Sequence, residues 1–136
     1  MVNKTRIRDA LAKLESQLKS LREKQTVSLE EYKRNRDLQA IVERRLYIAI
    51  QVSIDIAMHI VSENGPRKPE SYSDVFVVLS EMGVIDSAIS KRMEEEAGFR
   101  NVLAHEYADI IDREVYRHLQ QLDIFEAFAQ QINECY

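Results

Sequence analysis

The stretch from Ser28 to Glu63 contains neither glycine nor proline, and it constrains the fold more than any other feature of the sequence. Ser28, followed three residues later by Glu31, has the spacing of a capping box, which opens helices. Asn64-Gly65-Pro66 then supplies a helix stop signal. At 1.5 Å per residue, a helix over residues 28–63 is about 50 Å long. Such a helix can form the spine of a bundle.

The scarcity of turn-forming residues favours an all-α fold. Of 136 residues, 3 are Gly and 2 are Pro, whereas an all-β domain needs many turns and uses more of both. Hydrophobic periodicity and capping residues predict four more helices, over residues 4–24, over 71–83, from Asp86 onward and over 112–134. We therefore expect one helical domain over residues 1–136, an up-and-down bundle of four to five helices.

Several classes of site are not indicated by the sequence. A single cysteine, Cys135, excludes an internal disulfide and a cysteine-based zinc cluster. The three histidines are scattered, and no glycine-rich phosphate loop occurs. No apolar run approaches the roughly 18 residues of a membrane span, and the first residues lack the hydrophobic stretch of a signal peptide. We expect a cytoplasmic protein with no metal, no other cofactor and no membrane association.

Charge is distributed unevenly along the chain. The net charge of −4 combines an excess of basic residues in 1–45 with an excess of acidic residues in 46–136. One interpretation is that two helix faces are solvated differently. The other is that basic residues hold a polyanion or an acidic partner. The basic residues in question are Lys33, Arg34, Arg36, Arg44 and Arg45.

The second half of the long helix is apolar almost all round. Over residues 46–61 few polar side chains occur, so this part must be covered on most sides. A four-helix monomer can do this, but a homodimer in which the helix meets its twin does it more readily. The polar exceptions Gln51, Asp55 and His59 form one row at successive i+4 steps. This row either faces solvent or lines a cleft, and Asp55 and His59 could pair with each other.

A polar motif covers residues 99–107, Phe-Arg-Asn-Val-Leu-Ala-His-Glu-Tyr. The bare pattern Arg-x4-His is weak, because it occurs a second time as Arg113 and His118. We interpret that second copy as a surface arginine with a solvent-facing or helix-capping histidine. The fuller string Arg-Asn-x-x-Ala-His-x-Tyr is specific. An acidic run, residues 94–96, precedes it and could repel the phosphates of a bound polyanion.

This string resembles the HEPN superfamily, and within it the HepT-like toxins. Their hallmark, Arg-x4-His followed by x-Tyr, is matched position for position by Arg100, His105 and Tyr107. Residues 54–60 look like a segment on the second helix of these proteins, and residues 71–85 look like their third helix and turn. The likeness runs in the correct order over roughly residues 28–130. It implies a dimeric HEPN-like bundle.

The resemblance implies a metal-independent endoribonuclease toxin whose site forms from the Arg and His of two protomers. Cleavage without metal requires a 2′-hydroxyl that loses a proton and a 5′-oxygen leaving group that gains one, and histidine can do either near neutral pH. His105 is then the acid or base, and Arg100 stabilises the pentavalent phosphorane through its forked donors. RNA, not DNA, is the expected substrate, because the mechanism uses the 2′-hydroxyl.

Geometry sets a condition on this pair. On an ideal helix Arg100 and His105 project about 140° apart, so the pair works if the helix ends near His105 or if two protomers share the site. Asn101 lies on the same helix face as His105 and could orient its ring, while Asp55 and His59 are weaker supporting candidates. Taken alone, His105 could equally be a helix-terminal histidine bound by backbone carbonyls.

The resemblance also implies a partner, a minimal nucleotidyltransferase antitoxin that transfers AMP to Tyr107. Each adenylate would add bulk and negative charge two residues from His105. Without the resemblance, Tyr107 is a half-buried aromatic near a helix end. An alternative function is a non-catalytic HEPN helper that binds nucleotide or presents substrate to a nucleotidyltransferase. A structural helical adaptor is a third possibility.

Overall fold

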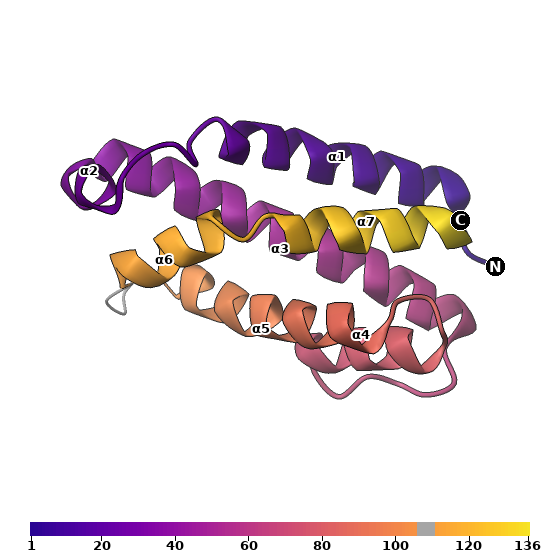
Figure 1. The fold of residues 1–136 in the computed structure, drawn as a ribbon. Coiled ribbons are helices and arrows are strands. Elements are labelled where there is room, and N and C mark those ends of the chain that lie inside the picture. Colours follow the sequence, from indigo (N-terminus) through magenta and orange to yellow (C-terminus); the bar gives the residue numbers. More distant parts are fainter. Residues whose placement is uncertain (106–110) are drawn as a thin grey trace.

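The computed structural model describes residues 1–105 and 111–136, and within these it contains seven helices and no strand (Figure 1). The prediction of an all-α fold is therefore confirmed. The helices are α1 (Lys4–Arg22), α2 (Leu29–Arg34), α3 (Arg36–Asn64), α4 (Tyr72–Glu81), α5 (Ser87–Ala104), α6 (Asp112–Leu119) and α7 (Asp123–Cys135).

Two of the predicted helices are each divided in two. The segment predicted over 28–63 begins at Ser28 as expected, but Asn35 interrupts it with an extended backbone (φ −114°, ψ 96°). The Asn35 side chain accepts the N–H of Leu38 at 3.0 Å, so this residue ends α2 and caps α3. Asparagine suits this position because its short amide satisfies a backbone donor that the helix leaves free. The predicted last helix is likewise split near residues 120–122 into α6 and α7.

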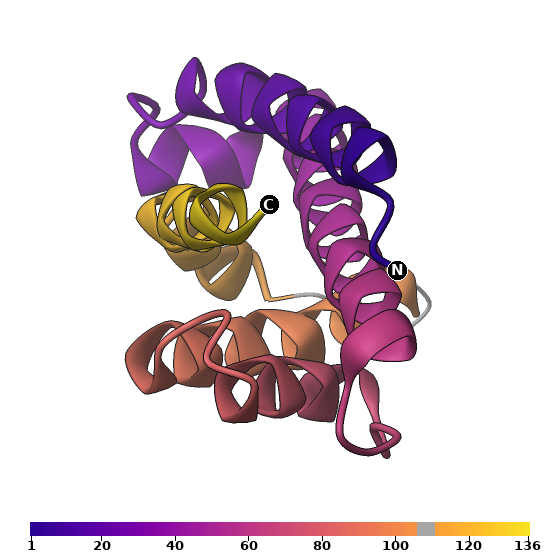
Figure 2. The ribbon, with the colours of Figure 1, turned by 90° about the vertical axis from the view of Figure 1, so that its right-hand side faces the viewer.

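The long helix α3 is the spine of the bundle. Seen along the bundle, α1 lies along one side of α3 and the α4–α5 pair lies along the other (Figure 2). Helix α7 lies opposite α3, between α1 and α5 (Figure 2). The largest fully buried side chains include Tyr32, Phe76, Phe125 and Phe128. Phe76 and Phe128 meet edge to face at 5.7 Å, which joins α4 to α7.

The bundle itself covers most of the apolar part of α3. The sequence left open whether one bundle or a homodimer covers residues 46–61, and most of their side chains are buried within the single chain. Among the described helices, α3 has the length and mean hydropathy of a membrane span, but 61% of that window is buried inside the bundle, as is usual for a core helix. The buried apolar residues of the segment are Leu46, Ala49, Ile50, Val52, Ile54, Ile56, Ala57, Ile60 and Val61.

One stripe of α3 is left uncovered. Its residues recur at spacings of three and four, so they share one helix face, and they are exposed or half-exposed. In Figure 2 no other helix covers the side of α3 turned away from α7. We call this stripe the open α3 face, which consists of Ile41, Arg44, Ile48, Gln51 and Asp55.

Candidate functional site

The motif lies where α5 ends. Helix α5 begins at an Asp86 cap, whose carboxylate accepts the Ile89 N–H at 2.8 Å, and its last helical residue is Ala104. His105 leaves the helix (φ −107°, ψ 65°), although its N–H still reaches the Asn101 carbonyl at 3.3 Å. The helix therefore ends next to His105, which is the condition under which Arg100 and His105 can act on one reacting group within one chain. The His105 side chain is exposed.

Arg100 is held by three polar contacts, two of them with side chains of α3. Its Nε donates to Gln51 Oε1 at 2.9 Å, one Nη donates to the Tyr47 hydroxyl at 3.3 Å, and the other donates to Asn101 Oδ1 at 3.3 Å. Arginine presents five donors in a fixed fork, so these contacts fix the plane of the guanidinium. Asn101 contacts both motif residues, because its side chain accepts from Arg100 and its carbonyl accepts from His105.

Two tyrosine rings also contact the guanidinium. The Arg100 Cζ lies 5.3 Å from the centre of the Tyr47 ring and 5.1 Å from that of Tyr72. A cation this close to an aromatic face is attracted by the ring quadrupole. The Tyr47 ring has a second cation beside it, because Arg44 Cζ lies 5.6 Å from its centre. Two guanidinium groups thus flank one aromatic side chain at the edge of the open α3 face.

The predicted polar row on α3 does not act as one unit. Gln51 joins Asp55 to the Arg100 network, because its Nε2 donates to Asp55 Oδ1 at 2.9 Å. His59 is instead buried, and its Nε2 accepts the backbone N–H of Asn3 at 3.0 Å. The pairing of Asp55 with His59 that the spacing allowed is not formed. His59 anchors the chain before α1, away from Arg100.

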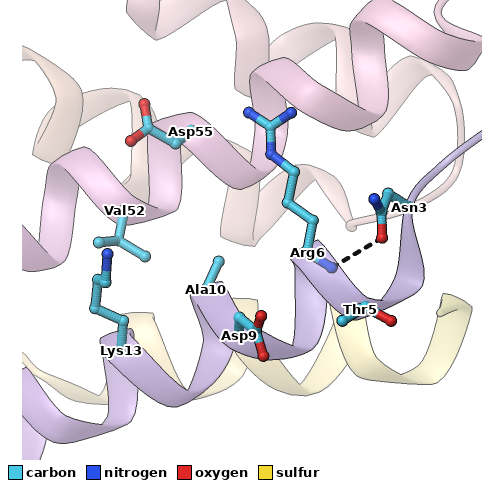
Figure 3. Close-up of a pocket in the computed structure, with 8 residues that line it drawn as sticks. All are labelled: Asn3, Thr5, Arg6, Asp9, Ala10, Lys13, Val52 and Asp55. Atoms are coloured by element: carbon cyan, nitrogen blue, oxygen red, sulfur yellow. Dashed lines mark hydrogen bonds between the residues drawn. The ribbon is translucent and has the colours of Figure 1, made fainter.

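Asp55 also borders a groove between α1 and α3, with a volume of about 410 Å³. Figure 3 shows the Arg6 side chain reaching from α1 toward α3, the helix that bears Asp55. The Lys13 side chain extends from α1 toward Val52 on α3 in the same view. The groove therefore places the basic side chains of Arg6 and Lys13 near Asp55, which Gln51 links to Arg100.

Comparison with known proteins identifies the family. The family model described as "Ribonuclease HepT-like" matches residues 7–132. The chain belongs to this family. It is 30% identical over 117 residues to a tRNA nuclease HepT of Aphanizomenon flos-aquae, with 85% of this chain and 80% of the relative covered. It is 29% identical over 99 residues to an mRNA nuclease HepT of Shewanella oneidensis, with 70% and 74% covered.

Solved structures share the fold of this chain. A toxin–antitoxin structure with AMP-PNP superposes with a TM-score of 0.87 at 24% identity, covering 96% of this chain and 98% of the other. The tri-AMPylated HEPN toxin of Shewanella oneidensis, solved with its MNT antitoxin, superposes with a TM-score of 0.85 at 25% identity, covering 95% and 97%. The predicted membership of the HepT-like group is confirmed, and with it the assignment to a family of nucleases.

The second Arg-x4-His copy in this HepT-like chain is not what the sequence suggested. His118 is 3% exposed, and its Nδ1 lies 2.9 and 3.0 Å from the two carboxylate oxygens of Glu96, which is equally buried. The Phe99 ring stacks on the imidazole at 3.8 Å between ring centres and 8° between planes. The interpretation as a solvent-facing or capping histidine is therefore wrong. Arg113, the other member of the pattern, is exposed as expected.

The acidic run, residues 94–96, is largely turned toward the bundle and not toward solvent. Glu96 points into the bundle, and the half-buried Glu94 accepts from the Ser90 hydroxyl at 3.3 Å. Only Glu95 of the three is exposed. Only one of the three carboxylates, that of Glu95, thus faces outward and could repel phosphates as expected.

The remaining predicted residues are placed as follows. Tyr107 lies outside the described residues. Of the basic group, Arg45 is half-buried and donates to Gln17 Oε1 at 3.1 Å, while the other four are exposed. Within residues 1–105 and 111–136 no group of three His, Cys, Asp or Glu side chains is arranged to hold a metal ion.

Two site residues were missed from the sequence. Tyr47 precedes Gln51 by four positions, so helix periodicity could have placed it on the same face of α3. Tyr72 begins α4 and reaches Arg100 only through tertiary packing. No local pattern signals that contact.

Proposed function

We propose that this chain is a metal-independent endoribonuclease toxin of a toxin–antitoxin pair, acting in the cytoplasm on RNA. The observation that carries the proposal is the Arg100 guanidinium, which α3 and α4 side chains hold beside the terminus of α5 where His105 stands. The nuclease names of the two HepT relatives support the reaction class. The whole residue range 1–136 acts as one domain in this proposal.

In the proposed reaction the 2′-oxygen attacks the adjacent phosphorus while a base removes its proton. The bond from phosphorus to the 5′-oxygen breaks, and an acid returns a proton to that oxygen. His105 supplies one of these roles in each protomer, and Arg100 donates to the non-bridging oxygens of the phosphorane. The products carry a 2′,3′-cyclic phosphate and a 5′-hydroxyl.

We propose that a second copy packs on the open α3 face and brings a second Arg100 and His105 to the site. Ile41 on this face is 43% exposed although it is apolar. A two-fold contact places the same surface of each copy against itself, and Gln51 lies within that surface beside Arg100. The two histidines could then divide the acid and base roles.

The catalytic assignment is tested with single-stranded RNA in the presence of EDTA. Arg100→Ala and His105→Ala should each lower cutting by at least about 10²-fold, as the loss of such groups generally does. Arg113→Ala is the matched control, because this exposed arginine belongs to the other Arg-x4-His copy, and it should cut like the parent. If the His105 variant cuts RNA as well as the parent protein, the catalytic role assigned to His105 is wrong. No cutting by the parent protein would instead favour the non-catalytic helper.

The dimer is tested by sedimentation at micromolar concentration. Ile41→Glu places a charge on the open α3 face and should shift the protein toward the monomer of about 16 kDa. Ala12→Glu, on the exposed face of α1, is the control and should leave the mass unchanged. A parent protein that sediments as a clean monomer contradicts the shared site.

We further propose that a minimal nucleotidyltransferase silences the toxin by transferring AMP to Tyr107. The tri-AMPylated toxin of Shewanella oneidensis supports this chemistry in a relative. Coexpression with the cognate antitoxin should add about 329 Da per AMP, located on Tyr107 by peptide mapping. Tyr107→Phe should keep its ribonuclease activity and escape silencing. If this variant is silenced as fully as the parent, inhibition acts by binding alone.

A further inference from the structure

A cavity lies directly beside Arg100, and the proposed reaction makes no use of it. It has a volume of about 440 Å³ and opens where α3, the start of α4 and the end of α5 meet. This volume falls in the range of about 300–1,000 Å³ that small-molecule sites have. Asn101, which contacts Arg100, forms part of its wall.

Two walls of the cavity are suited to a flat, weakly polar group. Tyr72 is 43% exposed and Met58 is 38% exposed, which is high for large apolar side chains. The Arg100 guanidinium covers Tyr72 from one side at 5.1 Å, and the ring also borders the cavity. An aromatic ring with a thioether beside it stacks readily on any nucleobase, because every base presents a π-face.

The polar groups of the cavity fit the edge of a base better than a phosphate. Among the described residues that line it there is no lysine or arginine, and the one charged side chain is Glu70, which would repel phosphate. The Asn101 oxygen is occupied by Arg100, which leaves its amide N–H groups to donate. Ser71 accepts the Asp74 N–H, so its own hydroxyl proton can also be donated. A carboxylate acceptor beside such donors favours bases with an exocyclic amino group over uracil.

Tyr72 joins the cavity to Arg100. Tyr72 contacts the guanidinium and lines the cavity, so a phosphate on Arg100 has its neighbouring base at the cavity mouth. We infer that this cavity holds the nucleobase next to the phosphate that Arg100 binds, stacked on Tyr72 and preferring amino-bearing bases. The inference rests on the proposed ribonuclease function for the identity of its ligand as RNA. It adds a base-binding subsite to the phosphate site.

The test uses binding alone, so it does not depend on cutting. The chain contains no tryptophan, and Tyr72→Trp therefore creates a single fluorescent reporter at a half-exposed position. Trinucleotides with 2′-O-methyl ribose cannot be cleaved by attack of the 2′-oxygen. Triadenylate of this kind should quench the tryptophan and bind about tenfold more tightly than an abasic analogue with the same phosphates. Met58→Trp, on the α3 side of the cavity, repeats the titration from a second position if the first variant folds poorly.

The selectivity is tested on the same reporter. Triadenylate should bind about threefold more tightly than triuridylate, and Glu70→Gln should reduce this difference because an amide both donates and accepts. If the abasic analogue binds with an affinity within a factor of two of that of triadenylate, the base-binding subsite is refuted, even if the parent protein cuts RNA. Free AMP binding as tightly as triadenylate overturns the RNA assignment in favour of a free nucleotide. Base-dependent quenching by a protein that does not cut keeps the subsite and refutes the ribonuclease.

Discussion

Replacing His118 with alanine should destabilise the fold strongly, although His118 lies outside the proposed site. Its imidazole and the Glu96 carboxylate are each 3% exposed and are joined by contacts of 2.9 and 3.0 Å. The substitution leaves the carboxylate buried without this partner and removes the ring that stacks on Phe99. Breaking a buried pair from one side costs about 3–5 kcal/mol of unfolding free energy. That is a large share of the roughly 5–15 kcal/mol available to a typical domain.

The assay is urea unfolding followed by circular dichroism, at one fixed protein concentration. A double-mutant cycle with Glu96→Gln measures the coupling between the two side chains. We expect the double variant to be much less destabilised than the sum of the two single variants, because it leaves no carboxylate buried without its partner. Arg113→Ala, an exposed change on the same helix as His118, should alter the free energy of unfolding by less than about 0.5 kcal/mol.

Two results would refute this reasoning. A loss below about 1 kcal/mol for His118→Ala would mean that Glu96 reaches water when the imidazole is gone. Additive single effects would mean that the two side chains do not interact in solution. The pair joins α5 to α6, so its loss should also loosen the contact between these two helices. Amide hydrogen exchange at the end of α5 would report this directly.

Three smaller predictions follow from other contacts. Arg67 and the backbone N–H of Glu70 lower the pKa of Asp74 to about 2. The resulting stabilisation of the fold is present above about pH 4 and is lost as the pH falls toward 2. Asp74→Asn should therefore reduce the change of the urea midpoint with pH between pH 4 and pH 2. His59→Ala removes the acceptor of the Asn3 N–H and should increase exchange at the N-terminus, measured by mass spectrometry, while RNA cutting is kept. Gln51→Ala frees the guanidinium of the motif and should weaken binding of uncleavable RNA about tenfold, measured by anisotropy, without lowering the unfolding midpoint.

Much of the fold follows from the sequence because helix signals are local. The Ser28 cap and the scarcity of glycine and proline predicted helices in their correct places. The breaks were harder to predict, because Asn35 is only a moderately poor helix former and ends α2 by capping the next helix. His118 was misread for a related reason. Its role depends on Glu96, which is 22 positions away, and no periodicity within α6 indicates that contact.

The candidate site shows the same division between local and tertiary information. The family motif points to Arg100 and His105, and the structure meets the condition that their spacing set, since α5 stops at Ala104. The environment of the guanidinium comes from tertiary packing, through Gln51 on α3 and Tyr72 on α4. An arginine side chain otherwise loses rotamer entropy of up to about 2 kcal/mol when it is immobilised by a ligand. Because these contacts restrict the guanidinium in advance, less of that cost falls on the phosphate-binding step we propose, and the bundle around α5 contributes to the proposed affinity through residues that no sequence motif contains.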